Sequence, residues 1–178
     1  IERISRKIGY APRIIALSAT MGNVEKAAEW IGKGTGRETH IIDVQESNIR
    51  WKIMCEHFFI DTESSDSIDA GFDYIHSSSQ KKRAIIFSNS REETELVCAA
   101  MHSISAKKGL DDPFYIHHGN LSAAIREDAE RALKSEEKKA VACATVTLEL
   151  GIDIGKLERI INLEAPNTVS SFLQRIGR

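Results

Sequence analysis

The sequence has few of the residues that would indicate a disulfide scaffold, a zinc site or a membrane span. Its 178 residues include three cysteines, Cys55, Cys98 and Cys143, which lie in separate apolar runs without a C-x-x-C pair. Such a scattered, odd-numbered set favours buried, reduced thiols. No apolar stretch approaches the ~20 residues that a membrane-spanning helix needs, and no signal peptide is visible. These absences predict a cytoplasmic protein without a membrane partner.

The sequence also lacks an excess of charge of either sign. The formal net charge is −2, so there is no general basic surface of the kind that coats nucleic acid. This leaves open a protein that grips a strand with backbone amides, hydroxyls and a few local cations. Apolar residues make up 42% of the chain, which is sufficient for a core.

Short apolar runs are spread along the chain. They predict strands at residues 13–17, 40–44, 53–60, 83–88, 114–117, 140–144 and 159–163. Several of these runs are continuously apolar, which is typical of strands buried on both faces of a parallel sheet.

The segments between these runs carry apolar residues at helical spacing. They predict helices at residues 24–31, 68–77, 92–105, 123–133 and 169–176. Asn23 and Ser122 precede two of these helices and are good N-caps. The alternation of strands and helices predicts an α/β fold with a doubly wound, mostly parallel sheet.

A change in composition indicates two domains. Residues 32–36 are rich in glycine, and the polar segment 45–50 follows a predicted strand. We therefore predict that residues 1–45 are the trailing edge of a preceding domain and that residues 46–178 form one small α/β domain. The sequence starts at Ile1 and stops abruptly, so we expect both ends to be cuts in a longer protein.

Polar segments follow most of the predicted strands. In open α/β sheets, ligands bind beyond the carboxyl ends of the strands. The segments are Ser18-Ala19-Thr20, Ser88-Asn89-Ser90-Arg91, His117-His118-Gly119-Asn120, Ala144-Thr145 with Glu149-Leu150-Gly151-Ile152-Asp153, and Gln174-Arg175-Ile176-Gly177-Arg178 after the last strand. Hydroxyls, amides and arginines at one edge suit the phosphates of a nucleic acid.

Each segment also has an ordinary explanation when it is taken alone. Residues 88–91 fit a helix N-cap followed by acidic residues, which the helix dipole favours. Asp153 fits a turn, and the arginines near the end fit a solvated helix face. His117 and His118 are adjacent strand residues that point to opposite faces, so we predict no shared metal. No nucleophile–base pair for acyl transfer stands out.

In this order, the segments resemble the second half of superfamily-2 helicases over nearly the whole chain. Residues 17–23 resemble motif III, 84–91 motif IV, 117–122 with Arg126 the family's H-H-G-x-L-S…R segment, 144–155 motif V, and 174–178 the start of motif VI. The wording L-E-L-G-I-D-I-G, the glutamine that opens motif VI and the segment E-W-I-G most resemble the large helicase-related (Lhr-like) branch.

The resemblance implies a RecA-like C-terminal domain from an ATP-dependent helicase, with ATP and Mg²⁺ bound mainly by a first RecA-like domain. Catalytic roles are implied for Arg178, as an arginine finger at the γ-phosphate, and for Arg175 and Gln174 at the same edge. Gly151 and Asp153 are implied to contact the nucleotide.

The resemblance also implies contacts to single-stranded or duplex DNA or RNA. The implied phosphate-binding residues are Ser88, Asn89, Gly119, Arg126 and Thr145. Three further residues, Ser18, Ala19 and Thr20, are implied to couple the nucleotide site to the strand site. The resemblance implies no metal ligands in this chain.

The sequence departs from a complete helicase in three ways. Residues 32–36 are not a P-loop, because Lys33 is not followed by Ser or Thr. No D-E-x-H motif is present, and motif VI is truncated before its further Gly-Arg. The chain alone is therefore predicted to be inactive and to require the first RecA-like domain in cis.

Two other interpretations remain beside the helicase fragment. One is a non-enzymatic α/β module that binds nucleic acid or a protein. The other, a response-regulator-like domain, needs an acidic pair at a strand end, and the strand ends offer none. In addition, the predicted strand 13–17 has an exposed edge, so we expect this piece to pack against the main domain or to mediate self-association.

Overall fold

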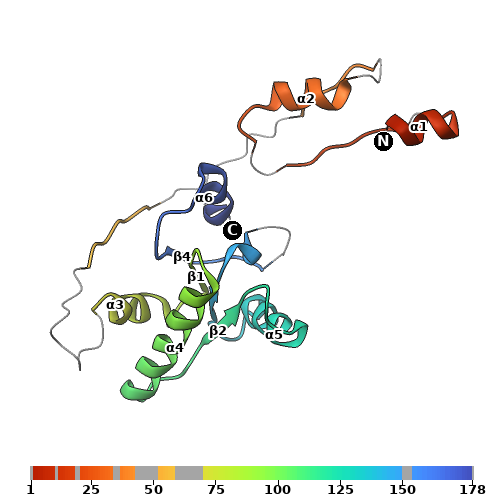
Figure 1. Cartoon of the computed structure of the whole chain (residues 1–178). Helices are drawn as coiled ribbons and strands as arrows, with labels where there is room; N and C mark the ends of the chain where they lie inside the picture. The colour runs from red at the N-terminus through yellow and green to blue at the C-terminus, as the bar shows by residue number, and fades with distance from the viewer. Residues whose placement is uncertain are drawn as a thin grey trace. The chain divides into compact units, whose positions relative to one another are not determined.

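The computed structural model describes residues 2–10, 12–18, 21–33, 37–42, 52–58, 70–149 and 154–177. The chain divides into two compact units, Ile1–Met54 and Cys55–Arg178 (Figure 1). Within the described ranges, no helix combines the length and apolar character that crossing a membrane requires. The predicted boundary at residues 45–46 lies outside the described residues, and the identity of the first unit stays a prediction.

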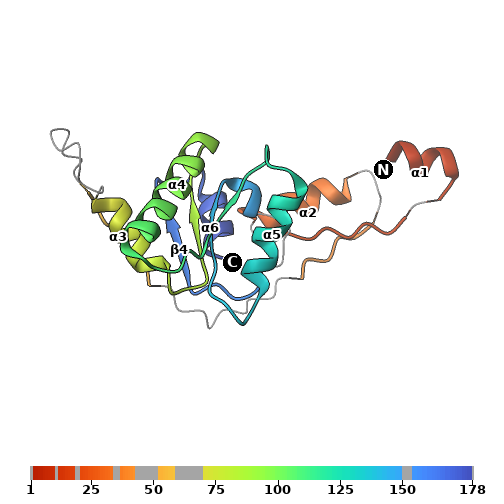
Figure 2. The ribbon, with the colours of Figure 1, turned by 90° about the horizontal axis from the view of Figure 1, so that it is seen from below.

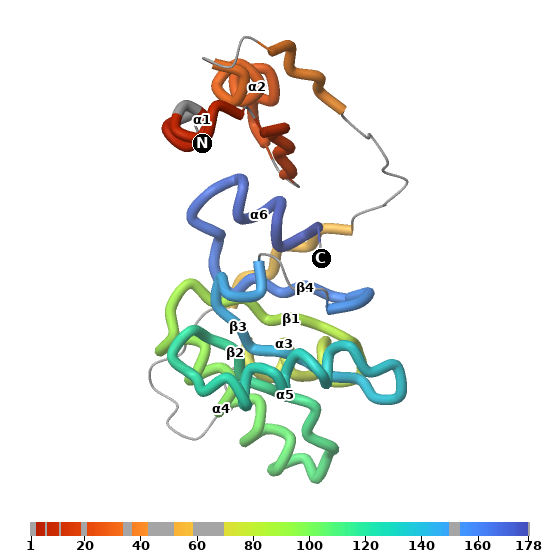
Figure 3. Tube along the Cα trace, turned by 90° about the vertical axis from the view of Figure 1, so that its right-hand side faces the viewer, coloured from red at the N-terminus to blue at the C-terminus, as the bar shows by residue number. Residues whose placement is uncertain are grey.

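The second unit is built on a four-stranded parallel sheet. Its strands are β1 (Ala84–Phe87), β2 (Phe114–His117), β3 (Val141–Ala144) and β4 (Arg159–Asn162). Their order across the sheet is β2-β3-β1-β4, and every neighbouring pair is parallel (Figure 3). All four were predicted to within one residue, and the parallel sheet is confirmed.

Helices cover both faces of this sheet. They are α3 (Ala70–Ser79), α4 (Arg91–Lys108), α5 (Ala123–Lys134) and α6 (Val169–Ile176), with a short 3-10 helix, η1 (Val146–Leu148). Helices α3 and α4 lie on one side of the sheet and α5 lies on the other (Figure 2). The doubly wound arrangement is therefore confirmed.

Residues of β1 alternate between two apolar clusters. Ile86 packs with Met101 of α4 on one face, and Ile85 packs with Leu133 of α5 on the other. All four side chains are fully buried. Because both faces of the strand are covered, the strand sequence is continuously apolar instead of alternating.

Local capping explains where the helices that border the sheet begin and end. The Ser90 side chain accepts a hydrogen bond from the Glu93 N–H at the start of α4, and Gly109 ends this helix with φ near +61°. Thr168 accepts from the Ser171 N–H at the start of α6. These caps fix the segments that follow β1 and β4.

The first unit contains two helices, α1 (Glu2–Ile8) and α2 (Val24–Gly32). Asn23 caps α2 by accepting from the Lys26 N–H at 2.7 Å. Helix α1 was not predicted. Gly32 ends α2 where a Cβ would lie only 2.6 Å from Thr39 Oγ1, so a larger residue would require the Thr39 side chain to shift.

The prediction of a strand at residues 13–17 was wrong. This segment is described, and it has no strand neighbour among the described residues of its unit. A strand needs a ladder of backbone hydrogen bonds to a second chain segment, and an apolar run cannot supply that partner. The described parts of the predicted strands 40–44 and 53–60 (residues 40–42 and 53–58) are likewise not strands.

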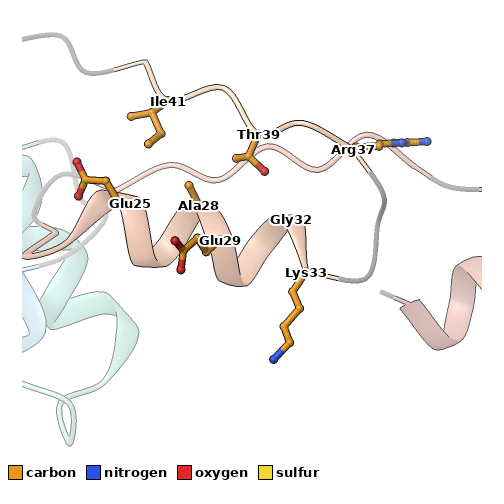
Figure 4. A pocket seen from close by; sticks show the side chains of 8 residues that line it. All are labelled: Glu25, Ala28, Glu29, Gly32, Lys33, Arg37, Thr39 and Ile41. Carbon is orange, nitrogen blue, oxygen red and sulfur yellow. The ribbon is translucent and has the colours of Figure 1, made fainter.

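A shallow hollow lies on the first unit between α2 and residues 37–41. It is lined by Glu25, Ala28, Glu29, Gly32, Lys33, Arg37, Thr39 and Ile41. The side chains of Lys33 and Arg37 point away from one another (Figure 4). Since these cations do not converge, the hollow offers no built site for an anion.

Candidate functional site

Three of the segments that follow strands meet at the carboxyl edge of the sheet, and one arginine joins them. Arg175 of α6 donates from Nε to Glu149 at 2.6 Å, from Nη1 to Asn162 at 2.9 Å and from Nη2 to Asn89 at 3.2 Å. Asn89 follows β1, Glu149 follows η1 and Asn162 ends β4. The network therefore ties together the segments that resemble motifs IV, V and VI.

Arg175 is buried in spite of its charge. Its side chain is 1% exposed, and its guanidinium lies over the Phe87 ring, 4.8 Å from the ring centroid. The carboxylate of Glu149 is 7% exposed. The planar guanidinium can satisfy three acceptors and stack on an aromatic ring at once, which a lysine cannot do.

Asn89 uses its side chain to hold the segment that follows β4. Its Nδ2 donates to Glu164 Oε2 at 3.2 Å and to the Ala165 carbonyl at 3.1 Å, while its Oδ1 accepts from Arg175. The Asn89 N–H donates to Glu93 at 3.1 Å. Its side chain is therefore engaged within the unit, and its predicted phosphate contact stays a prediction.

The hydroxyls of two other predicted contacts face the protein interior. Ser88 is 1% exposed, and its Oγ accepts from Thr94 Oγ1 at 3.2 Å. Thr145 is 7% exposed, and its Oγ1 lies 3.4 Å from Thr147 Oγ1. Both residues fix the ends of β1 and β3, and their predicted contacts to phosphate also stay predictions.

The two adjacent histidines point to opposite faces, as predicted. His117 contacts Thr147 through Nδ1 at 2.9 Å and Glu130 of α5 through Nε2 at 3.1 Å. His118 Nε2 lies 3.2 Å from Glu95 of α4, without the alignment of a hydrogen bond. Among the described residues, no group of three or more metal-ligating side chains is arranged around a common centre.

Gly119 and Arg126 are the predicted contacts with few partners inside the protein. Gly119 is exposed, and no atom lies within 4 Å of the position where a Cβ would be. Arg126, in the first turns of α5, is half-buried, and its Nε atom is buried without a hydrogen-bond partner in the described structure. An accessible backbone and a partly exposed cation suit the phosphates of a nucleic-acid strand.

The remaining predicted site residues are divided between the units. Gln174 is half-buried on α6, and Ser18 is exposed in the first unit. Five residues lie outside the described ranges: Ala19, Thr20, Gly151, Asp153 and Arg178. Their roles, and those of Gln174 and Ser18, stay predictions.

Residue-by-residue analysis of the sequence missed Glu149, Asn162 and Glu164. Glu149 was part of the motif V segment but was given no role. An acidic residue between Leu148 and Leu150 was a usable signal, because a carboxylate in an apolar run needs a cationic partner when it is buried. Asn162 gave no such signal, since it lies at the end of an ordinary strand.

Comparisons with known proteins identify the family of the chain. Residues 66–178 match the helicase conserved C-terminal domain family. The ATP-dependent helicase Lhr-Core of Methanothermobacter thermautotrophicus is 35% identical over 184 residues, which cover 100% of this chain and 21% of the relative. The Lhr-Core helicase of Saccharolobus solfataricus is 33% identical over 169 residues, or 92% of this chain and 19% of the relative.

A solved structure shows the same fold. The structure of Mycobacterium smegmatis helicase Lhr bound to ssDNA and AMP-PNP is 34% identical, with a TM-score of 0.54, over 67% of this chain and 16% of that one. This chain spans about a fifth of the length of the curated Lhr-Core relatives. The chain therefore belongs to the helicase conserved C-terminal domain family of superfamily 2, and its sequence is Lhr-like.

Proposed function

We propose that the chain supplies the second motor domain of an ATP-dependent helicase, which moves along a single strand of DNA or RNA. The observation that carries this proposal is the Arg175 network, which links the segments after β1, η1 and β4 to α6. We call the carboxyl edge of the sheet, with Gly119 and Arg126, the rim. A motor needs a rigid connection between the rim, which would face the nucleic acid, and helix α6, because nucleic-acid binding must be coupled to ATP hydrolysis.

In this proposal, the nucleic-acid strand binds to the accessible part of the rim. Gly119 offers an accessible backbone, and Arg126 offers a partly exposed cationic side chain. Contacts of this kind bind phosphates without reading sequence. Since the net charge of the chain is −2, affinity depends on these few local groups and not on a general basic surface.

The nucleotide side of the proposal rests on α6. Arg175 is buried and donates to three protein acceptors, so we assign it as a positioning residue and not as a direct contact to phosphate. It fixes the helix that leads to Arg178, which we propose as the arginine finger, with Gln174 beside it. ATP with Mg²⁺ would supply the energy of γ-phosphate hydrolysis, and the residues for binding them lie mainly in a first motor domain.

The first unit fits the trailing part of that motor domain. The Lhr-Core relative of Methanothermobacter thermautotrophicus aligns with the entire chain, first unit included. We propose that Ser18, Ala19 and Thr20 couple the nucleotide site to the strand site, and that Gly151 and Asp153 lie at the nucleotide.

Strand binding by the chain itself tests the rim. Arg126→Ala should weaken binding to a fluorescein-labelled oligo(dT) or oligo(U) strand about three- to tenfold in anisotropy titrations, because one phosphate contact is lost. Arg131→Ala is the matched control on the same helix, since Arg131 is 74% exposed and pairs with Asp128. Equal affinities for the two variants would contradict the assignment of the rim.

Hydrolysis by the longer protein tests the motor. Arg178→Ala in that protein should reduce strand-stimulated ATP hydrolysis about 10³-fold, because charge that develops at the γ-phosphate loses its stabilisation. Arg131→Ala should leave the rate unchanged. If Arg178→Ala hydrolyses ATP as fast as the parent, Arg178 is not the arginine finger. If the parent binds the strand but shows no strand-stimulated hydrolysis, the chain is a binding module and not part of a motor.

A further inference from the structure

Four side chains with reactive chemistry gather on the α3–α4 face of the sheet, in an arrangement that the proposed motor does not use. Cys98 and His102 lie one turn apart on α4, where side chains four residues apart are neighbours. Asp112 precedes β2, and Cys143 lies on the central strand β3. Cys98 and Cys143 both belong to the buried apolar cluster on this face.

The imidazole of His102 connects a thiol to a carboxylate. His102 Nε2 lies 3.4 Å from Cys98 Sγ, and His102 Nδ1 lies 2.5 Å from Asp112 Oδ2. The other carboxylate oxygen, Asp112 Oδ1, accepts from the Phe114 N–H at 3.2 Å, which fixes the carboxylate. With its Nδ1 proton donated to Asp112, His102 presents the Nε2 lone pair to the Cys98 thiol.

This arrangement favours the thiolate of Cys98. The hydrogen bond from Cys143 and the neighbouring His102 lower the pKa of Cys98 to about 7, although burial opposes them. Burial lowers the pKa of His102, but the hydrogen bond to Asp112 and the charge of Cys98 outweigh it, so the net shift is upward. The pair therefore has the character of a thiolate and an imidazolium.

The second thiol lies in the same buried apolar cluster as the first. The side-chain interaction with Cys98 and burial both raise the pKa of Cys143. Cys98 is 3% exposed, whereas the side chain of His102, which contacts it, is 47% exposed. The Cys98 sulfur thus lies one side chain below the surface, within reach of a small neutral oxidant and shielded from bulky reagents.

We propose that Cys98 and Cys143 form a peroxide-responsive dithiol, with His102 and Asp112 activating Cys98. The Cys98 thiolate attacks one oxygen of hydrogen peroxide, the O–O bond breaks, and the leaving hydroxide takes a proton from the His102 imidazolium to give water. Cys98 becomes a sulfenic acid. The Cys143 sulfur then attacks the Cys98 sulfur, the S–O bond breaks, and a second water leaves as the disulfide forms.

The product would join α4 to β3. Two thiols lose two hydrogen atoms and are oxidised, and one peroxide is reduced to two waters. Helix α4 begins directly after the Asn89 segment, and β3 leads to Thr145, so the cross-link would fasten together two elements that border the rim. The dithiol does not depend on the proposed motor function.

The test uses the full 178-residue chain with Cys55→Ser, which removes the exposed third thiol. The folded protein is treated with hydrogen peroxide at pH 7, and its mass and peptide map are recorded over time. We expect the loss of two hydrogen atoms and a Cys98–Cys143 disulfide. In the same background, Cys143→Ser should accumulate a sulfenic acid on Cys98 that dimedone traps.

Two further variants separate activation from simple burial. His102→Asn should slow oxidation at pH 7 about tenfold, because it removes an imidazole that lowers the pKa of Cys98 and that gives a proton to the leaving hydroxide. Ser103→Asn is the control at a neighbouring exposed position of α4. Circular dichroism and thermal unfolding confirm that each variant is folded before its rate is compared.

Three outcomes would overturn the proposal. In the first, the folded Cys55→Ser chain keeps Cys98 and Cys143 reduced at a peroxide concentration that oxidises Cys55 in the original chain. Another is a His102→Asn variant that oxidises as fast as its control. The last is stable sulfenic acid on Cys98 with Cys143 present and unreacted, which would show that Cys143 does not resolve it.

Discussion

Arg175 holds the carboxyl edge of the sheet together through contacts within the protein. Its guanidinium serves three acceptors from three different segments and lies over Phe87. Both charges of the Arg175–Glu149 pair are removed from water. Because each charge depends on the other, removing one leaves the other buried without compensation.

Arg175→Met should lower the free energy of unfolding by about 3–5 kcal/mol, because Glu149 is then an unpaired buried charge. The double variant Arg175→Met with Glu149→Leu should regain part of this loss. Urea unfolding of both variants and the parent provides the measurement. A single variant as stable as the parent would show that the ion pair contributes nothing to stability.

The burial of Arg175 could not be predicted from its spacing. Arg175 and Arg178 are three positions apart in the sequence, and a solvated helix face was a reasonable alternative. Its acceptors are distant in sequence: Asn89 is 86 residues away and Glu149 is 26. Only the sheet order brings these segments together, and local patterns contain no information about it.

The opposite edge of the sheet is held by a glutamate. Glu158, just before β4, accepts at Oε2 from the Arg83 N–H at 2.9 Å and from Lys139 Nζ at 2.6 Å. Arg83 precedes β1 and Lys139 lies just before β3. The hydrogen bonds from Lys139 and Arg83 lower the pKa of Glu158 to about 2. One carboxylate thus joins the starts of three adjacent strands.

Glu158→Gln should destabilise the protein at neutral pH, and the difference should disappear in acid. A carboxylate with a lowered pKa stabilises the folded state fully above its unfolded pKa of ~4.3. This contribution falls as the pH drops through about 2. Thermal unfolding at pH values from neutral down to about 2 measures this contribution. Glu127→Gln, on the exposed side of α5, is the control. A difference between Glu158→Gln and the parent that stays constant down to pH 2 would be inconsistent with this role.

Strands and helices of the second unit could be predicted because their signals are local. Buried parallel strands such as β1 and β3 are apolar throughout, and the capping residues Ser90 and Ser122 mark helix starts. Residues 13–17 carry the same apolar signal and are not a strand. The difference lies in the availability of a hydrogen-bonding partner, which composition does not reveal.

Exposed apolar side chains on the first unit bear on how the chain behaves in solution. Ile15 is 75% exposed, Leu17 94% and Trp30 78%. Scattered apolar residues are ordinary on protein surfaces, but three large ones on a unit with few buried residues should be covered. The expected cover is either the second unit or another copy of the chain.

Leu17→Asp should therefore reduce the average mass in light scattering if copies associate, because a charge would be buried at the contact. Arg13→Asp, an exposed position in the same segment, changes charge without removing apolar surface and serves as the control. A monomeric parent whose first unit resists protease would indicate packing within one chain. A monomer whose first unit is cut freely would exclude both forms of cover.

The order of the strands also determines when the sheet can begin to form during synthesis. Strand β1 is the first to leave the ribosome, yet Ala84 pairs with Val141 on one side and with Arg159 on the other. The strand that follows it, β2, pairs with β3 and not with β1. A nascent chain must therefore hold the apolar strand β1 without its two neighbours until β3 and β4 have emerged, a delay that slows folding and leaves apolar surface exposed in the meantime.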